Sequence, residues 1–305
     1  MRNTTVLLLL LAACRPLGRA PGASGNNFLN PILAVDENLE FLELRSFSHR
    51  IRGLIDERKK TGAASHVSVY FRDLENGPLF GVEMEEKFTP ASLLKVPFMM
   101  AILKEAETDP ALLSRRYRAD KVMMSRTNFA TEALKRDSEY SVDELLRAMI
   151  AASDNEAFAV LRLVVGAEPF NEIFRELGFL IPGVRGMDDF MTVREYATFF
   201  RVLYNASYLS KPMSQKALEY LAASEFKQGL AAGVPPGVAV AHKYGERFLN
   251  TAVQRQLHDC GIVYHPAKPY VLCVMTRGED FEKMSGVIRD ISALVYAEID
   301  SQIKR

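Results

Sequence analysis

Strand-like segments lie at both ends of this 305-residue chain, and helical patterns fill the stretch between them. Near the N-terminal end, residues 66–73 alternate like a strand, and residues 79–83 form a return strand after the turn Glu75-Asn76-Gly77-Pro78. Three more strand-like runs occupy residues 238–244, 257–264 and 270–276. Two strands early and three late indicate one antiparallel sheet made from both ends of the chain.

Amphipathic patterns predict helices before and after these strands. Residues 37–60 carry an apolar stripe at helical spacing, and the chain ends on a second striped helix. The stripe of the second helix consists of Phe281, Met284, Ile288, Ile291, Val295 and Ile299. We therefore expect an α+β fold in which a five-stranded antiparallel sheet is flanked by N- and C-terminal helices.

The middle of the chain, from about residue 100 to residue 232, has helical patterns. Ser141-Val-Asp-Glu144 is a capping box that opens a helix over residues 145–152, and further helices are expected over 157–165 and 194–204. This stretch is predicted to be an all-helical lobe inserted into the α+β part. A cleft between the two lobes is a natural place for a site.

The composition is that of a soluble globular protein, with 48% apolar and 25% charged residues. Positive and negative side chains balance at 38 each, which gives no reason to expect a nucleic-acid partner. The five histidines are scattered, and no Cys/His spacing indicates a metal site. Neither a metal nor an organic cofactor is implied.

The N-terminus resembles an export signal. Arg2 precedes the short apolar run 6–13, which is too short to span a bilayer, and small residues lead directly to Cys14. This pattern is similar to the lipobox of bacterial lipoproteins, and the alternative is a plain secretory signal with an incidental cysteine. We expect residues 1–14 to direct export to the bacterial cell envelope, with a lipid anchor at Cys14 as the only membrane contact. Residues 15–35 have the composition of a flexible linker, which leaves 36–305 as the folded domain.

Cys260 and Cys273 are the other two cysteines, and they fall in two consecutive predicted strands. In an exported protein they are able to form a cross-strand disulfide. Two buried free thiols are an equally acceptable interpretation.

Ser92 and Lys95 lie three residues apart where a polar, proline-marked segment enters an apolar helix. Residues at i and i+3 are neighbours on a helix face, so the Lys95 amine can reach the Ser92 hydroxyl. A lysine with a lowered pKa can act as the base that activates a serine. The pattern is common, since Ser224/Lys227 and Ser301/Lys304 also match it.

Two further motifs follow in order, Ser153-Asp154-Asn155 between helical segments and Lys243-Tyr244-Gly245 on a strand. Alone, the first is more often a helix cap, with Asp154 accepting bonds from the loop backbone. Alone, Lys243 is ordinarily a solvated charge on an edge strand.

Together with Ser92-Leu-Leu-Lys95, these motifs resemble the penicillin-recognising serine acyl-transferase family, in particular class A β-lactamases and related penicillin-binding proteins. The resemblance extends from about residue 40 to the C-terminus. It implies a β-lactamase/transpeptidase-like fold and catalysis through an acyl-enzyme.

The resemblance also implies residue roles. Ser92 would be the nucleophile and Lys95 its base, or the residue that positions an activating water. Ser153 would relay a proton to the leaving nitrogen, assisted by the charge of Lys243. Asn155 would hydrogen-bond the amide side chain of the substrate.

The oxyanion hole would consist of the backbone N–H groups of Ser92 and Glu246, because Glu246 follows the Lys-x-Gly motif. Gly245 fits a strand position that a ligand approaches closely. Tyr244 occupies the position where the family has a small hydroxyl residue that binds a substrate carboxylate. Its ring is too large for that role, so we expect Arg247 to supply the carboxylate contact as a bidentate donor.

A second departure concerns release of the acyl group. Class A β-lactamases carry a Glu-x-x-Leu-Asn segment whose glutamate activates the deacylating water, and residues 178–192 contain no such segment. Asp188 or Asp189 could substitute, although a cap of the following helix is the preferred interpretation. His258-Asp259 suggests a Ser-His-Asp triad, but no Gly-x-Ser-x-Gly elbow accompanies it.

The sequence therefore predicts an exported active-site serine hydrolase that opens β-lactam rings, with slow deacylation. The alternatives are a D-alanyl-D-alanine peptidase, amidase or esterase that acts on cell-wall peptides, and a sensor that stays acylated. In each case the partner is a small-molecule β-lactam or a D-Ala-D-Ala peptide.

Overall fold

The computed structural model describes residues 44–75, 77–119, 129, 134–135, 137–183, 188–248 and 254–303. The predicted signal segment, Cys14 and the linker lie outside these residues. The chain divides into residues 1–37 and a compact unit over 38–305, and the following account concerns the second unit.

One five-stranded antiparallel sheet contains the strands from both ends of the chain, as predicted. The sheet order is β2-β1-β7-β6-β5. The strands are β1 (His66–Asp73), β2 (Leu79–Val82), β5 (Val240–Phe248), β6 (Arg255–Val263) and β7 (Tyr270–Gly278). Strand β1 pairs with β7 from His66 opposite Arg277 to Asp73 opposite Tyr270, so the two ends of the chain meet in the middle of the sheet.

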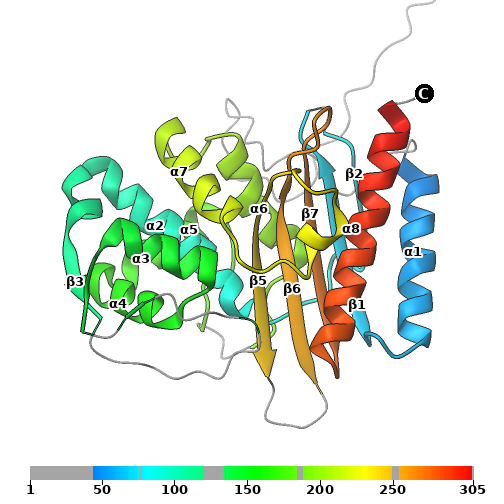
Figure 1. Ribbon diagram of the computed structural model, residues 1–305, viewed down its shortest axis with the longest axis horizontal. Coiled ribbons are helices and arrows are strands. Elements are labelled where there is room, and N and C mark those ends of the chain that lie inside the picture. Colours follow the sequence, from blue (N-terminus) through cyan, green and yellow to red (C-terminus); the bar gives the residue numbers. More distant parts are fainter. Residues whose placement is uncertain are drawn as a thin grey trace, which may run out of the picture. The chain divides into compact units, whose positions relative to one another are not determined.

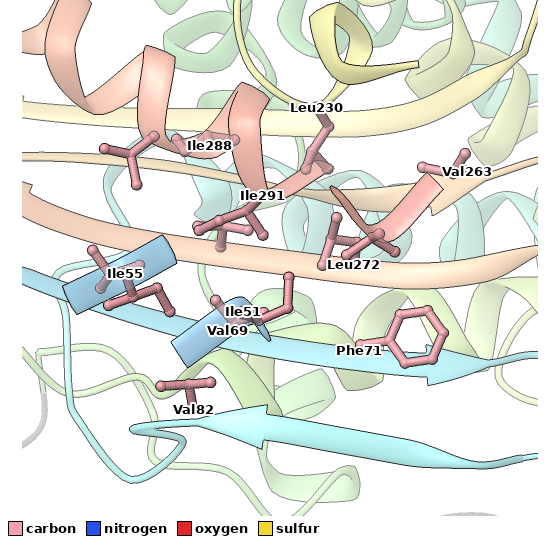
Figure 2. Close-up of a cluster of buried hydrophobic side chains, with 14 of the residues drawn as sticks. Ile51, Ile55, Val69, Phe71, Val82, Leu230, Val263, Leu272, Ile288 and Ile291 are labelled. Carbon is pink, nitrogen blue, oxygen red and sulfur yellow. The ribbon is translucent and has the colours of Figure 1, made fainter. Parts of the chain in front are cut away.

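Helices α1 (Arg45–Lys60) and α8 (Phe281–Ile303) cover one face of this sheet (Figure 1). The predicted stripe of α8 is buried throughout. Figure 2 shows Ile51 and Ile55 of α1 and Ile288 and Ile291 of α8 gathered over apolar side chains of the strands. The part of the first helix predicted before residue 44 lies outside the described residues.

The other face of the sheet is covered by α6 (Val193–Tyr204), which contacts β1, β6 and β7. Around α6 lie the other helices of the middle stretch, seen in cyan, green and yellow-green in Figure 1. They are α2 (Lys95–Thr108), α3 (Val142–Arg147), α4 (Asn155–Val165), α5 (Glu168–Glu176) and α7 (Lys211–Ala222). Shorter helical turns are η3 (Ala91–Leu94), η4 (Pro110–Ser114), η5 (Ala148–Ala152) and η6 (Leu230–Gly233).

The middle stretch also contains a short two-stranded sheet that its helical pattern did not predict. Strand β3 (Arg116–Arg118) pairs with β4 (Glu139–Ser141). Strand β4 runs directly into α3, which begins with the predicted capping box of Ser141 and Glu144. Strands of three residues are too short to show a periodic pattern, which is why the sequence did not predict them.

Strand β5 continues to Phe248, four residues beyond its predicted end, because Gly245 to Phe248 stay paired with β6. The Lys-x-Gly segment therefore lies inside a strand. Cys260 and Cys273 are directly opposite each other on β6 and β7 and form a disulfide, which resolves the two interpretations of these cysteines. Among the described residues, no helix combines the length and apolar character that crossing a membrane requires.

Candidate active site

Ser92 lies in a 3-10 turn, η3, which leads directly into α2. The preceding residue, Ala91, has a left-handed backbone with φ of +50°, an unfavourable conformation for a residue with a Cβ. This bend leaves Ser92 partly exposed while Leu93 beside it is fully buried. The predicted regular helix start is thus a tight turn that presents the serine.

The Lys95 amine is directed towards Ser153 and Asn155. Lys95 Nζ donates to the Ser153 carbonyl oxygen at 2.6 Å and to Asn155 Oδ1 at 2.7 Å, and it lies 3.2 Å from Ser153 Oγ. Within the described part of the chain, Ser92 Oγ makes no hydrogen bond, so the expected local Lys95–Ser92 pair is not formed in this structure. Burial lowers the pKa of Lys95 to about 7, against the opposing charges of Asp154 and Glu246.

Ser153 is placed by an unusual helix end. A π-helical turn, η5, precedes it, and Ser153 itself has a left-handed backbone with φ of +58°. Asp154 then starts α4 by accepting a hydrogen bond from Ala157 N at 2.9 Å, and it also accepts one from Leu134 N at 3.3 Å. The predicted structural role of Asp154 is confirmed, and the tight reversal turns the Ser153 side chain towards the two lysines.

Lys243 is fully buried, so the solvated edge charge considered for it is wrong. Its amine donates to Ser153 Oγ at 2.8 Å and to the Tyr244 carbonyl oxygen at 3.1 Å. Burial, and next the charge of Lys95, place the pKa of Lys243 well below its usual value. Ser153 Oγ therefore lies between two buried amines whose positive charge is disfavoured.

Gly245 lets strand β5 approach the nucleophile turn. A Cβ at this position would lie 2.7 Å from the Pro90 carbonyl oxygen and 3.1 Å from Leu93 N. Because β5 is an edge strand, alternate backbone N–H groups point away from β6. This arrangement brings the backbone after Gly245 close to Ser92, where an oxyanion hole has to lie.

The Tyr244 ring does not take the place of a small hydroxyl. It is buried and stacks on Phe226 with a centroid distance of 4.4 Å, and Lys243 Nζ lies 4.3 Å from its centroid. Burial raises the pKa of Tyr244, with the charge of Glu246 as the second cause. The Tyr244 hydroxyl is buried and has no hydrogen bond of good geometry within the described residues.

The next two residues of β5 carry opposite charges. Glu246 is 9% exposed, and its Oε1 accepts a hydrogen bond from Phe129 N at 3.2 Å. Arg247 donates to Thr89 Oγ1 at 2.5 Å and pairs with Asp188 at 2.7 Å. The guanidinium of Arg247 is thus already engaged by Asp188, the loop carboxylate.

A cluster around Thr89, called here the Thr89 clamp, holds the segment before the nucleophile. Thr89 N donates to Gln256 at 2.9 Å, Thr89 Oγ1 donates to Asp189 at 2.6 Å, and His258 Nε2 lies 3.0 Å from the Thr89 carbonyl oxygen. Asp189 also accepts hydrogen bonds from Gln256 at 2.9 Å and Arg277 at 3.1 Å. Burial would raise the pKa of Asp189, but the Thr89 and Gln256 hydrogen bonds and the nearby arginine charges hold it below its usual value.

The clamp corrects two interpretations of the sequence. Neither Asp188 nor Asp189 caps the following helix, since Thr192 and Glu195 form the capping box of α6. His258 and Asp259 make different contacts: His258 serves the clamp, whereas Asp259 pairs with His242 at 2.8 Å. They are therefore not partners in a Ser-His-Asp triad.

The sequence missed Thr89, Gln256 and the role of Asp189, because all three are isolated polar residues without a motif. The only signal available was position in the sequence: Thr89 lies just before the nucleophile turn, Gln256 on a predicted strand boundary and Asp189 in a loop. No group of His, Cys, Asp and Glu able to hold a metal ion occurs among the residues that the structure describes.

The amines of Lys95 and Lys243 are buried, have lowered pKa values and share the hydroxyl of Ser153. A partly exposed serine, Ser92, lies beside them on a strained turn. This arrangement is that of an active-site serine hydrolase. The model of the β-lactamase enzyme family matches residues 46–299. The chain therefore belongs to this family and is a β-lactamase-like serine hydrolase.

Solved structures of the same fold include a mutant of PBP-A in an acyl-enzyme complex with penicillin G. It is 22% identical, with 83% of this chain and 97% of that chain covered and a TM-score of 0.69. A β-lactamase from Chitinophaga pinensis is 20% identical, with 82% and 99% covered and a TM-score of 0.72. The TLA-3 extended-spectrum β-lactamase is 18% identical, with 82% and 98% covered and a TM-score of 0.72. No curated protein matches the chain.

Proposed function

We propose that this protein reacts with β-lactams through an acyl-enzyme at Ser92 and releases the opened product slowly. The observation that carries the proposal is the hydrogen-bonded series Lys95–Ser153–Lys243 beside the nucleophile turn. A neutral amine in this series is the base that a serine nucleophile needs.

In acylation, Ser92 Oγ attacks the lactam carbonyl carbon while its proton passes to the neutral Lys95 amine. The C–N bond then breaks, and the nitrogen takes a proton from Ser153 Oγ, which is replenished from Lys95 through their hydrogen bond. The N–H groups of Ser92 and Glu246 stabilise the oxyanion, and loss of one such donor typically costs about 2.7–4 kcal/mol of transition-state stabilisation. Asn155 holds the amide on the acyl side, and the backbone at Gly245 lies against the bound substrate.

We expect slow release because the site offers no uncommitted carboxylate base in the described part of the loop before α6. Deacylation needs a base that activates a water near the ester, and Asp189 is committed to the Thr89 clamp. Arg247 is the proposed contact for a substrate carboxylate, and it would have to exchange Asp188 for the substrate. A mutant of PBP-A, which shares the fold, is known as an acyl-enzyme complex with penicillin G, and this supports an acyl-enzyme as the intermediate.

The test uses the full chain with a fluorescent penicillin and a chromogenic cephalosporin. We expect a stoichiometric adduct on Ser92, detected as a mass increase, and turnover that is slow compared with its formation. Ser92→Ala should abolish both. An adduct that still forms in Ser92→Ala, or no reaction with either compound, would contradict the proposal.

A second candidate is a peptidase, amidase or esterase that acts on cell-wall peptides ending in D-Ala-D-Ala. The absence of a free deacylating base among the described residues 178–183 and 188–192 favours it, because an open-chain leaving group departs and lets water enter. Release of D-alanine from such a peptide, at a rate above β-lactam turnover, would select this candidate. A stable adduct without peptide hydrolysis would select the sensor.

We also propose export to the bacterial cell envelope with a lipid anchor at Cys14. The apolar run before Cys14 in the sequence supports this proposal. Metabolic labelling with a fatty acid should tag the chain, and Cys14→Ser should lose the label. Labelling that persists in Cys14→Ser would contradict the anchor.

A further inference from the structure

The amine of Lys95 has an aromatic neighbour as well as polar partners. The Ser153 carbonyl oxygen and Asn155 Oδ1 accept hydrogen bonds from it. The ring centroid of Phe158 lies 5.9 Å from Lys95 Nζ. Phe158 belongs to α4 and lies outside the three motifs of the site, so no pattern in the sequence indicated it.

Helices α2 and α4 meet beside the base in two layers. Lys95 and Phe98 are three residues apart on α2, so they share a helix face, and Asn155 and Phe158 have the same spacing on α4. In the polar layer, Lys95 Nζ donates to Asn155 Oδ1 at 2.7 Å. In the apolar layer, the rings of Phe98 and Phe158 pack edge to face at 5.1 Å. One layer therefore holds the base, and the next layer covers it.

Phe158 forms the outer part of this cover. Lys95 and Phe98 are each only 2% exposed, whereas Phe158 is partly exposed. Phe170 of α5 packs against Phe98 at a ring distance of 5.8 Å, one contact further along the cluster. Loss of the Phe158 side chain would open the surroundings of the Lys95 amine to water, while loss of Phe170 would loosen the same cluster without uncovering the amine.

Burial is the main cause of the lowered pKa of Lys95, which lies at about 7. The charges of Asp154, at the start of α4, and of Glu246, on β5, act to raise this pKa. The neighbouring cation is Lys243 of β5, whose amine shares Ser153 Oγ with Lys95. The charges around Lys95 thus have both signs, and exclusion of water outweighs them.

The other charged groups around α2 in the described part of the chain lie at the surface or are paired. Arg162 of α4 is exposed, with its guanidinium carbon 5.7 Å from the Phe158 centroid. The charged residues of α5 are all exposed, and so are those of α7 apart from Lys216, which pairs with Asp143 at 2.6 Å. The turns η3, η4 and η5 carry no charged residue.

An aromatic ring can also favour an ammonium group through the electron-rich face of the ring. This attraction acts within about 6 Å of the ring centroid, so Lys95 at 5.9 Å lies at the limit of its reach. Exclusion of water disfavours the charged form and lowers the pKa of a lysine. The two effects have opposite signs, so the direction of the change after substitution distinguishes them.

We propose that Phe158 is a positioning residue whose side chain keeps water away from Lys95, so that this amine is able to take a proton at neutral pH. The catalytic consequence rests on the proposed acyl-enzyme at Ser92. Phe158 acts through Lys95, and it adds to the site a residue that belongs to none of the motifs.

Phe158→Ala is the test, because alanine preserves the helix and leaves space for water beside the amine. Two measurements use the full chain. NMR of lysine labelled with carbon-13 at Cε follows the protonation of Lys95 directly, and its signal is assigned by its absence from Lys95→Ala. Adduct formation with a fluorescent penicillin from pH 5 to pH 10 follows the same proton through acylation of Ser92.

We expect both midpoints to lie near 7 in the wild type and to rise by about one pH unit or more in Phe158→Ala. At pH 7 the neutral fraction of Lys95 would then fall from about one half to about one tenth, and acylation would slow about fivefold. Phe158→Leu keeps an apolar cover without the ring, so its midpoint should stay near that of the wild type. Phe170→Ala is the matched control for a loosened cluster, and it should also leave the midpoint unchanged.

An unchanged NMR midpoint in Phe158→Ala, or an equal rise in Phe170→Ala, would overturn the inference. A midpoint that falls in both Phe158→Ala and Phe158→Leu would also overturn it, since it would show that the ring attracts the ammonium group. Phe158→Ser is the second variant if Phe158→Ala fails to fold. If the wild type forms no adduct at any pH while the NMR midpoint moves as expected, the proposed function is overturned and the role of Phe158 at Lys95 stands.

Discussion

The amine of Lys95 makes its hydrogen bonds with residues of the Ser153 turn, about sixty positions along the chain. The sequence identified the two residues as a local pair through their helical spacing. Spacing predicts only which residues are neighbours along an element, and the partners of Lys95 come from another one. The chemistry of Lys95 could therefore be predicted, whereas its hydrogen bonds could not.

Acylation of Ser92 should become faster as the pH rises through about 7. Burial lowers the pKa of Lys95 to about 7, so the amine is protonated and unable to accept a proton below that pH. Adduct formation with a fluorescent penicillin, followed by quenched mass spectrometry between pH 5 and 9, measures this midpoint. Lys95→Ala should slow acylation by about 10²–10⁴-fold. A midpoint that persists near 7 in Lys95→Ala would assign it to another group.

The stability of the fold should fall as the pH decreases from 6.5 to 4. Burial lowers the pKa of His258 to about 4, so the folded state keeps His258 neutral while the unfolded chain takes up a proton. The difference amounts to about 3 kcal/mol of unfolding free energy, lost as the pH falls towards the folded pKa. Urea unfolding at several pH values measures it. In His258→Gln this component should be absent, and an unchanged pH dependence in that variant would be evidence against it.

At the scale of elements, the Thr89 clamp connects β6, β7 and the loop before α6 to the nucleophile turn, and Arg247 of β5 also donates to Thr89. Such a cluster is not predictable from a sequence, because its polar residues lie far apart along the chain. The helices and strands around it were predictable, since their apolar runs and the turns between them are local patterns along the chain. The π-helical turn before Ser153 was not, because its geometry depends on tertiary packing.

Thr89→Val should slow acylation and lower stability. It removes the hydroxyl that donates to Asp189 and accepts from Arg247, and hydrogen bonds to charged groups contribute about 1.5–3 kcal/mol each. Without this hydroxyl, the strained bend at Ala91 has less support. Thr89→Ser keeps the hydroxyl and is the matched control. Thermal unfolding and the acylation rate are measured for both variants. If both variants acylate equally, the hydroxyl does not position the nucleophile.

Gly245→Ala should reduce acylation at least tenfold. The added Cβ would lie 2.7 Å from the Pro90 carbonyl oxygen, so β5 or the nucleophile turn has to move. Misplacement by about 1 Å can cost about 10²-fold in rate. Gly53→Ala on α1 is the control, because its Cβ meets nothing within 4 Å. Acylation of Gly245→Ala at the wild-type rate would show that this close approach is not required.

For the molecule as a whole, the motifs in their order predicted the family and the fold, and the family match and the sheet order confirm both. The five predicted strands are present, with ends shifted by a few residues because pairing, and not the local pattern, decides where a strand ends. The disulfide could not be decided from the sequence, since the register of β6 against β7 determines whether the cysteines face each other.

Loss of the disulfide should destabilise the whole unit. Cys260 and Cys273 are 13 residues apart, and a crosslink of this loop size contributes about 3 kcal/mol by restricting the unfolded chain. The double variant Cys260→Ala, Cys273→Ala should show this decrease in urea unfolding. Reductant added to the native wild type should leave the disulfide and the unfolding free energy unchanged, because both cysteines are buried. Two free thiols in the unreduced, denatured protein would contradict the bond.

The pairing of β1 with β7 has a consequence for how the protein is made. His66 lies opposite Arg277, so partners about 200 residues apart form the centre of the sheet. A nascent chain on the ribosome holds β1 and β2 long before β7 exists, and β1 then has one open edge. Contacts of such high sequence separation also slow folding, because a long loop has to close before they form. The hairpin of β1 and β2 therefore waits until β7 has been synthesised, and any factor that shields a strand edge during that interval would raise the yield of active enzyme.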